Sequence, residues 1–479
     1  MDIKQYVLLS LLFLLQLTFS IRVLLRTHRQ PASRIAWLVV INAFPFVGVL
    51  AYLALGEVSI GLSRMQRLKS VQRCLELAQI NNIPVKPPEI PIRYQALFTL
   101  GQSISGFFPV GGNTAQLLAN SEAAITQLVA DIDAAQHHIS ILFYIWLNDN
   151  SGTQVADALV RAAQRGVTCR ILIDRFGSRF LLRSPLWHKM RAAGVQLGIA
   201  LPVKSLLLAP FTGRLDIRNH RKIVVIDRDI TYCGSQNCAD PAFTIKAKYA
   251  PWVDIWVRFT GPIASQNQIL FANDWLLHVN EDTSQQLRLP TIAGFDDNVI
   301  AQVIGTGPTI RATATSEFIS QLLSVANYHI FITTPYYVPD EIIQTALCTA
   351  AYRGVDTSII FPARNDSWIV SAASRSYYIS LLQAGVKIYE YQKGLLHAKT
   401  ITLDNELSFI GSTNLDRRSF ELNYENNMLI YNQAFTHDVQ TRQRAYLADS
   451  QQITLEAVQA WSKPRQLWNN TIAMLGPVL

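Results

Sequence analysis

The stretch H-R-K-I-V-V-I-D-R-D-I-T-Y-C-G-S-Q-N occupies residues 220–237, and H-A-K-T-I-T-L-D-N-E-L-S-F-I-G-S-T-N occupies residues 397–414. Both stretches read His-x-Lys, four residues, Asp, six residues, Gly-Ser-x-Asn. Two copies of such a pattern at identical spacing do not arise by chance. We therefore expect one site that uses each copy once, face to face. The matching pairs are His220 and His397, Lys222 and Lys399, Asp227 and Asp404, Gly234 and Gly411, Ser235 and Ser412, and Asn237 and Asn414.

Each copy opens with its His-x-Lys pair at the start of an apolar, β-branched run, at 222–227 and 399–403. Such runs predict strands. Side chains at positions i and i+2 share one face of a strand, so each imidazole should lie beside its own ammonium group. A neighbouring Lys lowers the proton affinity of a His and attracts anions. Two such pairs facing each other would form a pocket for a phosphate group.

These residue types can carry out covalent catalysis on phosphorus. One neutral His attacks the phosphorus atom, and the other, protonated, gives its proton to the leaving oxygen. Metal binding is a weaker interpretation, because a protonated Lys cannot be a ligand and the Cys/His spacing of a metal site is absent. We expect no metal and no cofactor. The expected substrate contacts are made by the motif residues Ser235, Asn237, Ser412 and Asn414.

The motif aspartates, Asp227 and Asp404, allow two interpretations. Their place in the motif puts them in the candidate catalytic set with the His and Lys residues. Each one also follows its strand directly, so it could instead organise the turn. Four aromatic residues follow strands in matching places, and core packing is favoured over lining of a substrate channel. They are Tyr144, Trp146, Tyr336 and Tyr337.

The first 60 residues are the most apolar part of the chain. Residues 6–21 form an apolar run of 16, and residues 35–55 contain no charge over 21 positions. The first run, before Arg22, lacks a small-x-small cleavage site, which argues against a removed signal peptide. We expect a transmembrane helical hairpin. Arginines in the hairpin loop favour a cytoplasmic loop and a catalytic body on the outer face, but basic residues of similar density follow the second run, so the side stays open.

The remainder of the chain repeats with a period of about 190 residues, after a proline-rich linker at 84–91. Apolar strand runs alternate with helical patterns in each half, which predicts an α/β fold with a parallel or mixed sheet. We expect four regions: the hairpin at 1–60, a juxtamembrane and linker region at 61–105, a first domain at 106–290 and a second at 291–479. A pseudo-twofold relation between the two domains would bring both motifs to one cleft.

Two segments stay open at this level. Residues 201–217 form an insertion in the first half that either contacts membrane or packs on the body. The C-terminal tail is amphipathic and either packs on the body or lies at a membrane interface. The net charge of +8 suits nucleic acid or an anionic membrane, and the apolar N-terminus favours anionic membrane lipid over nucleic acid.

The paired motifs resemble those of the phospholipase D superfamily, and further residues resemble the bacterial cardiolipin synthases of that superfamily. These residues include P-Y-Y-V-P-D-E at 335–341, N-L-D-R-R-S-F-E-L-N-Y-E at 414–425 and Y-L-A-L-G-E at 52–57. The resemblance departs at Arg228–Asp229, where the family has a tighter turn, and at 117–124. It implies two phospholipase D-like α/β domains with mixed sheets behind the transmembrane hairpin, in the inner (cytoplasmic) membrane of a bacterial cell.

The resemblance also implies the reaction. One phosphatidylglycerol would give its phosphatidyl group to a His and release glycerol, and a second phosphatidylglycerol would accept the group to form cardiolipin. His220 would be the nucleophile and His397 the general acid. Asp254, 34 residues after His220, would orient His220, and Glu425, 28 residues after His397, would orient His397. The alternatives are a hydrolase of the same superfamily, with water as acceptor, and a membrane scaffold without activity. The oligomeric state stays open.

Overall fold

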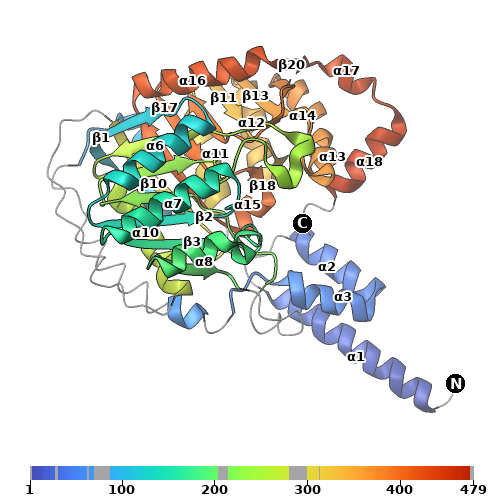
Figure 1. The fold of residues 1–479 in the computed structure, drawn as a ribbon. Coiled ribbons are helices and arrows are strands. Elements are labelled where there is room, and N and C mark those ends of the chain that lie inside the picture. Colours follow the sequence, from blue (N-terminus) through green and yellow to red (C-terminus); the bar gives the residue numbers. More distant parts are fainter. Residues whose placement is uncertain are drawn as a thin grey trace.

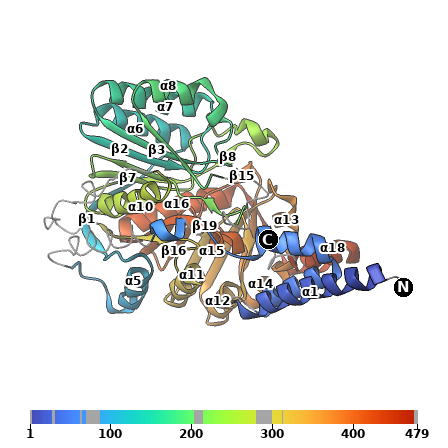
Figure 2. The same cartoon turned by 90° about the horizontal axis from the view of Figure 1, so that it is seen from below.

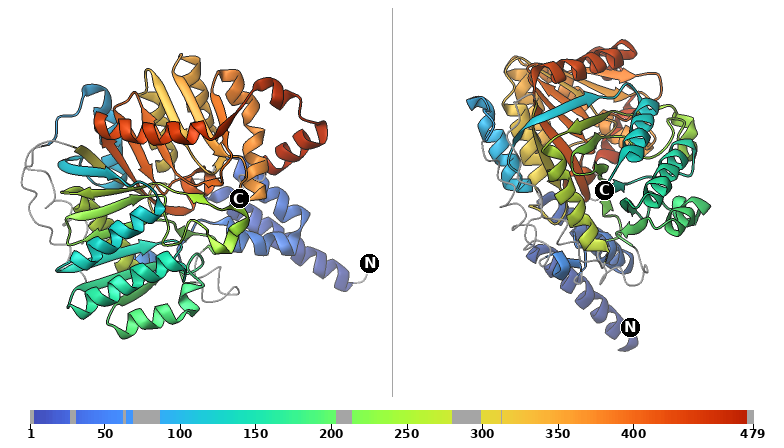
Figure 3. Two further views of the ribbon diagram at one scale, coloured as in Figure 1. Left: turned by 45° about the horizontal axis from the view of Figure 1, so that its top comes forward. Right: turned by 60° about the vertical axis from the view of Figure 1, so that its left-hand side comes forward.

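The computed structural model describes residues 3–26, 31–61, 64–68, 87–202, 214–279, 299–311 and 313–474. Most of the insertion expected at 201–217 lies outside these residues, as does the first part of the linker at 84–91. The two halves of the body lie side by side, and the N-terminal helices project from one end (Figure 3).

The N-terminus contains one helix that is long and apolar enough to cross a membrane among the described residues. This helix, α1 (Ile3–Leu25), has a mean hydropathy of 2.1 and is almost entirely exposed. The second apolar run does not form one uninterrupted helix. It divides into α2 (Pro31–Ala43), α3 (Pro45–Ala51) and the π-helical turn η1 (Tyr52–Gly56). Pro45 lacks the amide hydrogen that would continue the helix, so the second half of the expected hairpin is a broken helical segment, and its crossing of a membrane stays a prediction.

The body is built on one mixed sheet that runs through both halves in the order β20-β14-β13-β11-β16-β17-β19-β10-β1-β9-β7-β6-β2-β3-β4. In each half three parallel strands continue into antiparallel ones, and the antiparallel pair β1–β10 joins the halves. The α/β class and the mixed sheet are therefore confirmed. The first-half strands are β1 (Val110–Leu117), β2 (His138–Phe143), β3 (Thr168–Asp174), β4 (Gln196–Ala200), β6 (Ile223–Ile226), β7 (Ile230–Gly234) and β9 (Trp256–Thr260). The second-half strands are β10 (Val299–Thr306), β11 (His329–Thr333), β13 (Asp356–Pro362), β14 (Lys387–Tyr391), β16 (Thr400–Leu403), β17 (Leu407–Gly411), β19 (Asn423–Tyr431) and β20 (Ser450–Ile453).

Helices cover this sheet, as Figure 1 shows. Several begin at an Asn or Asp whose side chain accepts an amide hydrogen of the first turn, which fixes the start of the helix. The first-half helices are α6 (Ser121–Ala134), α7 (Asn150–Gln164), α8 (Pro185–Ala192) and α10 (Ile263–His278). The second-half helices are α11 (Ala314–Ser324), α12 (Glu341–Tyr352), α13 (Trp368–Ser376), α14 (Tyr378–Ala384), α15 (Arg417–Glu421), α16 (Gln433–Ala448), α17 (Leu455–Gln459) and α18 (Lys463–Ala473). Helix α5 (Ile92–Ser105), in the stretch expected to be linker, packs on β10 and α11.

Two very short parallel ladders cross between the halves, and they decide the position of the site. In one, β5 (Arg218–Asn219) of the first half pairs with the start of β19. In the other, β8 (Trp252–Val253) of the first half pairs with β15 (Leu395–Leu396) of the second. Each ladder ends directly before a motif His. The two halves are therefore bonded to each other at the residues that carry the candidate chemistry.

The N-terminal segment is attached beside the first of these ladders. The amide of Arg214 donates to the carbonyl of Ser59 at 2.8 Å, and that of Leu215 donates to the carbonyl of Ala54 at 3.4 Å. Residues after the helices also pack into a small apolar cluster under β5, which includes Ile60. The chain that leads to the first motif is thus fixed to the end of the N-terminal helices.

Candidate active site

The two motif histidines lie where the halves meet, and each one is bonded to the opposite half through its backbone. The amide of His220 donates to the carbonyl of Tyr424 at 2.9 Å, and the amide of His397 donates to the carbonyl of Val253 at 2.8 Å. These bonds continue the two short ladders by one residue. Both imidazoles are buried.

The histidines pair with carboxylates of the opposite half, which corrects the expected pairing. Nδ1 of His220 lies 2.9 Å from Oε2 of Glu425, and Nδ1 of His397 lies 2.6 Å from Oδ1 of Asp254. The expectation that Asp254 holds His220 and Glu425 holds His397 is wrong. The reason is the ladder register: Val253 pairs with Leu396 and Tyr424 pairs with Asn219, so the next residues along each strand meet across the halves.

Because Nδ1 of each ring faces a carboxylate, Nε2 is the nitrogen left for chemistry. A carboxylate at Nδ1 fixes the ring orientation and favours the tautomer with its proton on Nδ1. The Nε2 lone pair of a neutral ring is then available to attack phosphorus. Both rings have an aromatic neighbour: Tyr144 lies 5.0 Å from His220 and Trp252 lies 4.8 Å from His397, between ring centres.

The motif serines hold the carboxylates, and this replaces the expected contact with substrate. Oγ of Ser235 donates to Oδ1 of Asp254 at 2.6 Å, and Oγ of Ser412 donates to Oε2 of Glu425. The Oγ atoms of Ser235 and Ser412 also accept backbone amides, at 3.1 and 2.9 Å. Both serines are fully buried. Their hydroxyl groups are therefore used inside the protein, where they hold the two carboxylates.

The motif lysines are also fully buried and converge on the histidines. Nζ of Lys222 donates to the carbonyl of His220 at 2.7 Å, and Nζ of Lys399 donates to that of His397 at 2.6 Å. Burial is the main cause that lowers the pKa of Lys222 to about 8 and that of Lys399 to about 7, and the charge of Lys222 lowers the pKa of Lys399 further. Two buried ammonium groups beside the two histidines form a binding site for an anion.

The same burial keeps both histidines neutral in the free site. Burial lowers the pKa of His220 to about 4, with a further decrease from Lys222, although Glu425 opposes it. The pKa of His397 is lowered as well, by burial and then by Lys399. For Asp254, burial alone would raise the pKa, but the contacts with His397 and the other polar neighbours outweigh it and bring the pKa to about 2. The site therefore combines ionised carboxylates with neutral imidazoles.

The motif aspartates lie outside this cluster, so their assignment as catalytic is corrected. The carboxylate of Asp227 accepts the amides of residues 136–138 at 2.8 to 2.9 Å, and that of Asp404 accepts the amides of residues 327–329 at 2.8 to 3.0 Å. Both aspartates start a turn with positive φ, at 49° in each case. They fix the chain before β2 and β11, which is the turn role considered from the sequence.

The motif asparagines lie at the same edge as the histidines, and their expected substrate contact stays a prediction. Oδ1 of Asn237 accepts the amide of Ile145 at 3.1 Å, which leaves the amide nitrogen of the side chain for a ligand. In Asn414 the backbone amide donates to Ser419 at 3.2 Å, and the buried Oδ1 has no partner among the described residues.

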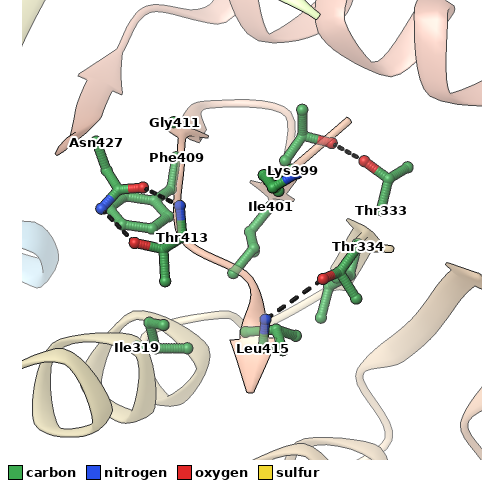
Figure 4. Close-up of a pocket in the computed structure, with 12 residues that line it drawn as sticks. Ile319, Thr333, Thr334, Lys399, Ile401, Phe409, Gly411, Thr413, Leu415 and Asn427 are labelled. Carbon is green, nitrogen blue, oxygen red and sulfur yellow. Dashed lines mark hydrogen bonds between the residues drawn. The ribbon is translucent and has the colours of Figure 1, made fainter. Parts of the chain in front are cut away.

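A small cavity lies behind Lys399 in the second half (Figure 4). Its walls hold polar side chains that bond to one another: Thr333 and Thr400 share a hydrogen bond of 2.7 Å, and Nδ2 of Asn427 donates to Thr413 at 2.7 Å. Because these groups are satisfied within the protein, the cavity supports the Lys399 stem and adds no further candidate residue.

Sequence reasoning missed two residues that shape the site. Trp252 contacts His397 but stands in no motif. Arg221 occupies the variable position between His220 and Lys222; it forms a buried ion pair with Asp274 at 2.8 Å and donates to the carbonyl of Glu425 at 3.1 Å. Of the four aromatic residues considered, Trp146 and Tyr337 lie in the core as expected, whereas Tyr144 faces His220.

Comparison with known proteins places this geometry in a family. The family model "Cardiolipin synthase, PLD-like domain" matches residues 128–275 and 319–445, and the model "Phospholipase_D-nuclease N-terminal" matches residues 14–57. Among solved structures, phosphatidylserine synthase from Haemophilus influenzae Rd KW20 has a TM-score of 0.60 at 14% identity and covers 81% of this chain and 100% of that one. This structure supports the fold alone.

Curated relatives align over almost the whole chain. Cardiolipin synthase A of Erwinia tasmaniensis is 39% identical over 471 residues, which are 95% of this chain and 94% of that protein. Cardiolipin synthase A of Yersinia pseudotuberculosis is 38% identical over 477 residues, with the same shares. With a family model across both halves and relatives of this identity along the full length, the protein belongs to the phospholipase D-type cardiolipin synthases, a family of membrane-anchored phosphatidyltransferases.

Proposed function

We propose that this protein transfers the phosphatidyl group of one phosphatidylglycerol to the headgroup hydroxyl of another, so that it forms cardiolipin and releases glycerol. The observation that carries the proposal is the crossed pairing: each motif contributes a His whose Nδ1 is held by a carboxylate of the other half. Two buried lysines beside them match the negative charge of a phosphodiester. The family membership supports the choice of lipid.

In the first step, Nε2 of His220 attacks phosphorus. The N–P bond forms and the bond from phosphorus to the glycerol oxygen breaks, and that oxygen takes a proton from His397. Lys222 and Lys399 stabilise the charge on the five-coordinate transition state. Glu425 stabilises the positive charge on the substituted His220 ring. The bound phosphodiester offsets the charge of the lysines, which favours the protonated form of His397 that this step needs.

In the second step, His397 acts as the general base. It takes the proton from a hydroxyl of the second phosphatidylglycerol, whose oxygen attacks phosphorus from the side that glycerol has left. The new P–O bond forms, the P–N bond breaks, and Nε2 of His220 recovers its lone pair. Asp254 orients His397 through both steps. No metal ion and no cofactor enters this sequence, since the lysines supply the positive charge.

A second candidate is hydrolysis at the same site, with water as acceptor. The similarity to cardiolipin synthases along almost the whole chain disfavours it. The two functions separate in one assay of the purified full-length chain in phosphatidylglycerol vesicles. We expect cardiolipin and glycerol in equal amounts. Phosphatidic acid as the main lipid product would favour the hydrolase instead.

We also propose the bacterial cytoplasmic membrane as the location, with α1 and the broken segment 31–56 both crossing it and the catalytic body on the outer face. The arginine-rich loop between them supports this orientation. A protease added to intact spheroplasts should then digest the body. Digestion only after lysis would place the body in the cytoplasm.

A further inference from the structure

Two exposed groups of aromatic side chains flank the candidate active site, one from each half. In the first half, Phe176 and Phe180 are 54% and 44% exposed. In the second half, Trp368 and Trp468 are 62% and 52% exposed, and their rings stack with centres 5.8 Å apart. Side chains of this size are usually buried, and exposed groups of them mark contact surfaces. We call these groups the first and second rim.

The rims occupy equivalent places in the two halves. Strands β3 and β13 are the matching middle strands of the parallel sets, and they end at Asp174 and Pro362. Phe180 and Trp368 each follow six residues later. The same aromatic position is therefore present in both copies of the fold, although the neighbouring sequences differ. Internal packing does not explain it, because both rings face solvent.

Both rims lie at the edge of the sheet that carries the site. The carboxylate of Asp174, where the first rim begins, accepts the amide of Asn219, the residue before His220, at 3.1 Å. In the second half, Asp366, just before Trp368, accepts the hydroxyl of Tyr336 at 2.6 Å. The buried Asp366 also pairs with Lys246 of the first half. The rims thus stand on opposite sides of the line along which the halves meet.

The first rim is joined to the N-terminal helices. Arg218 of β5 lies over the ring of Phe176, with its guanidinium carbon 4.8 Å from the ring centre. The segment just before Arg218 holds the backbone bonds to Ser59 and Ala54 at the end of those helices. In the second rim, α13 and α18 lie on the side of the body from which α1 extends, as Figures 1 and 2 both show. The first rim is therefore joined to the apolar N-terminus, and the second rim lies on the same side of the body as that segment.

The charge at the first rim matches an anionic surface. The guanidinium carbon of Arg179 lies 5.1 Å from the ring centre of Phe176 and 4.6 Å from that of Phe180. Among the described residues, no carboxylate lies within ion-pair distance of Arg179. A cation on exposed aromatic rings is the arrangement that suits the headgroup region of a bilayer, where rings enter the apolar boundary and a guanidinium meets phosphates.

We propose that the two rims dock on an anionic phospholipid bilayer and hold the active-site opening against the lipid surface. The membrane anchor keeps the protein near the bilayer, and the rims fix the angle of the body. Lipid headgroups would then reach the buried histidines without leaving the membrane plane. The proposal rests on the proposed function only in taking a membrane lipid as substrate.

The direct test measures fluorescence quenching of the full-length chain reconstituted in phosphatidylglycerol vesicles whose acyl chains carry bromine. Bromine quenches only tryptophans at the membrane, so Trp368 and Trp468 should be quenched, as should Trp37 in the N-terminal helices. The double change Trp368→Phe and Trp468→Phe should remove the part of the quenching that these residues contribute. Unchanged quenching in this variant would overturn the proposal. This readout does not depend on catalysis.

A second test measures activity with matched variants. Changing Phe176 and Phe180 together to Ser, or Trp368 and Trp468 together to Ser, should raise the KM for phosphatidylglycerol in vesicles several-fold. Turnover of a short-chain phosphatidylglycerol dissolved below its micelle concentration should stay as in the unaltered protein. Equal losses with both substrates, in variants whose thermal unfolding matches that of the unaltered protein, would contradict docking.

The matched control changes Tyr328 and Tyr352 to Ser. Both are 71% exposed, but Tyr328 precedes β11 and Tyr352 ends α12, so they lie at the opposite edge of the sheet from the rims. Neither KM should change. An equal rise in KM would show that exposed aromatic residues matter regardless of place and would overturn the proposal. If the unaltered protein makes no cardiolipin from either substrate, the proposed function fails, while the quenching test still decides on docking.

Discussion

At His220 and His397, the pKa of each ring depends on which carboxylate the ring faces. Burial makes the charged form of an imidazole costly, and an adjacent carboxylate compensates for part of that cost. In this site the compensation comes from the opposite half of the chain, Glu425 for His220 and Asp254 for His397. Removing one carboxylate should therefore impair the His of the other motif.

The crossed pairing can be tested with Glu425→Gln and Asp254→Asn. With phosphatidylglycerol, each change should lower kcat by roughly 10²- to 10⁴-fold, as expected when the group that orients a catalytic His is lost. With a donor whose leaving group needs no proton, Asp254→Asn should recover most of the rate of the first step, because only the acid His397 is impaired. Glu425→Gln should stay slow, because it impairs the nucleophile. Stopped-flow measurement of leaving-group release follows this step. The reverse pattern would support the uncrossed pairing, or exchanged roles of the histidines.

The pH dependence should reflect the two lysines. Their pKa values in the free site, about 8 for Lys222 and about 7 for Lys399, lie below the ordinary value mainly because of burial. Protonated lysines bind the phosphodiester, and His397, whose pKa is lowered by burial and by Lys399, must be protonated to act as the acid, so kcat/KM should fall as pH rises through the pKa of His397 and fall more steeply through 7 to 8. Bound substrate stabilises the ammonium form, so the fall in kcat should come at higher pH. Profiles of both constants, measured in vesicles of constant composition, check this. Identical alkaline limbs for the two constants would contradict it.

At the scale of elements, the turn aspartates and the two short ladders have different structural roles. Asp227 and Asp404 each accept three backbone amides and fix the start of a parallel strand. The ladders β5–β19 and β8–β15 are only two residues long, yet they set which carboxylate meets which His. A change in the first group should therefore affect stability, and a change at the ladder ends should affect catalysis.

Asp404→Ala tests this separation. It leaves three partly buried amides without an acceptor, which should lower the free energy of unfolding by about 1 to 3 kcal/mol. The folded fraction should retain kcat close to that of the unaltered protein. Thermal unfolding in detergent, together with kcat per folded molecule, measures both effects. A loss of kcat by several orders of magnitude in a stably folded variant would return Asp404 to the catalytic set.

The strands and the convergence of the parts that repeat in the sequence could be predicted from it, although the roles of the repeated Asp and Ser residues could not, and the parts that do not repeat could not be predicted either. The strands at 222–227 and 399–403, the α/β class and the convergence of His and Lys all follow from residues present at fixed spacing in both copies. The crossing of Asp254 and Glu425 could not be read in this way, since a two-residue ladder has no periodic pattern. The same is true of Arg221, whose position in the motif is variable. Pro45 by itself predicts the break after α2. The uncharged run that contains it favours a single spanning helix, and the hairpin prediction gives that run more weight.

For the whole molecule, the main consequence is that one chain holds one complete site. The sheet runs through both halves without interruption. Each His–carboxylate pair takes one residue from each half. In the proposed mechanism, neither motif can act with its own half alone. The anchor, the cross-half ladders and the rims then present this single site to the membrane.

Mixing experiments test the single site. The variants His220→Ala and His397→Ala should each be inactive, and a mixture reconstituted in the same vesicles should stay inactive, because no chain of the mixture holds both histidines. The control is a mixture of either variant with the unaltered protein, which should show activity in proportion to the unaltered chains. Recovery of activity in the mixture of variants would show that two chains contribute to one site.

The most direct test of the central claim, a covalent phosphatidyl intermediate on His220 with His397 as its acid, is the location of the adduct. The His397→Ala variant is mixed with a phosphatidyl donor whose leaving group needs no proton, quenched in acid-free denaturant, digested and analysed by mass spectrometry. We expect a phosphatidyl group on the peptide that contains His220, and no adduct in the His220→Ala variant under the same conditions. An adduct on His397 alone in the unaltered protein, with none on His220, would show that His397 is the nucleophile and that the two roles are exchanged.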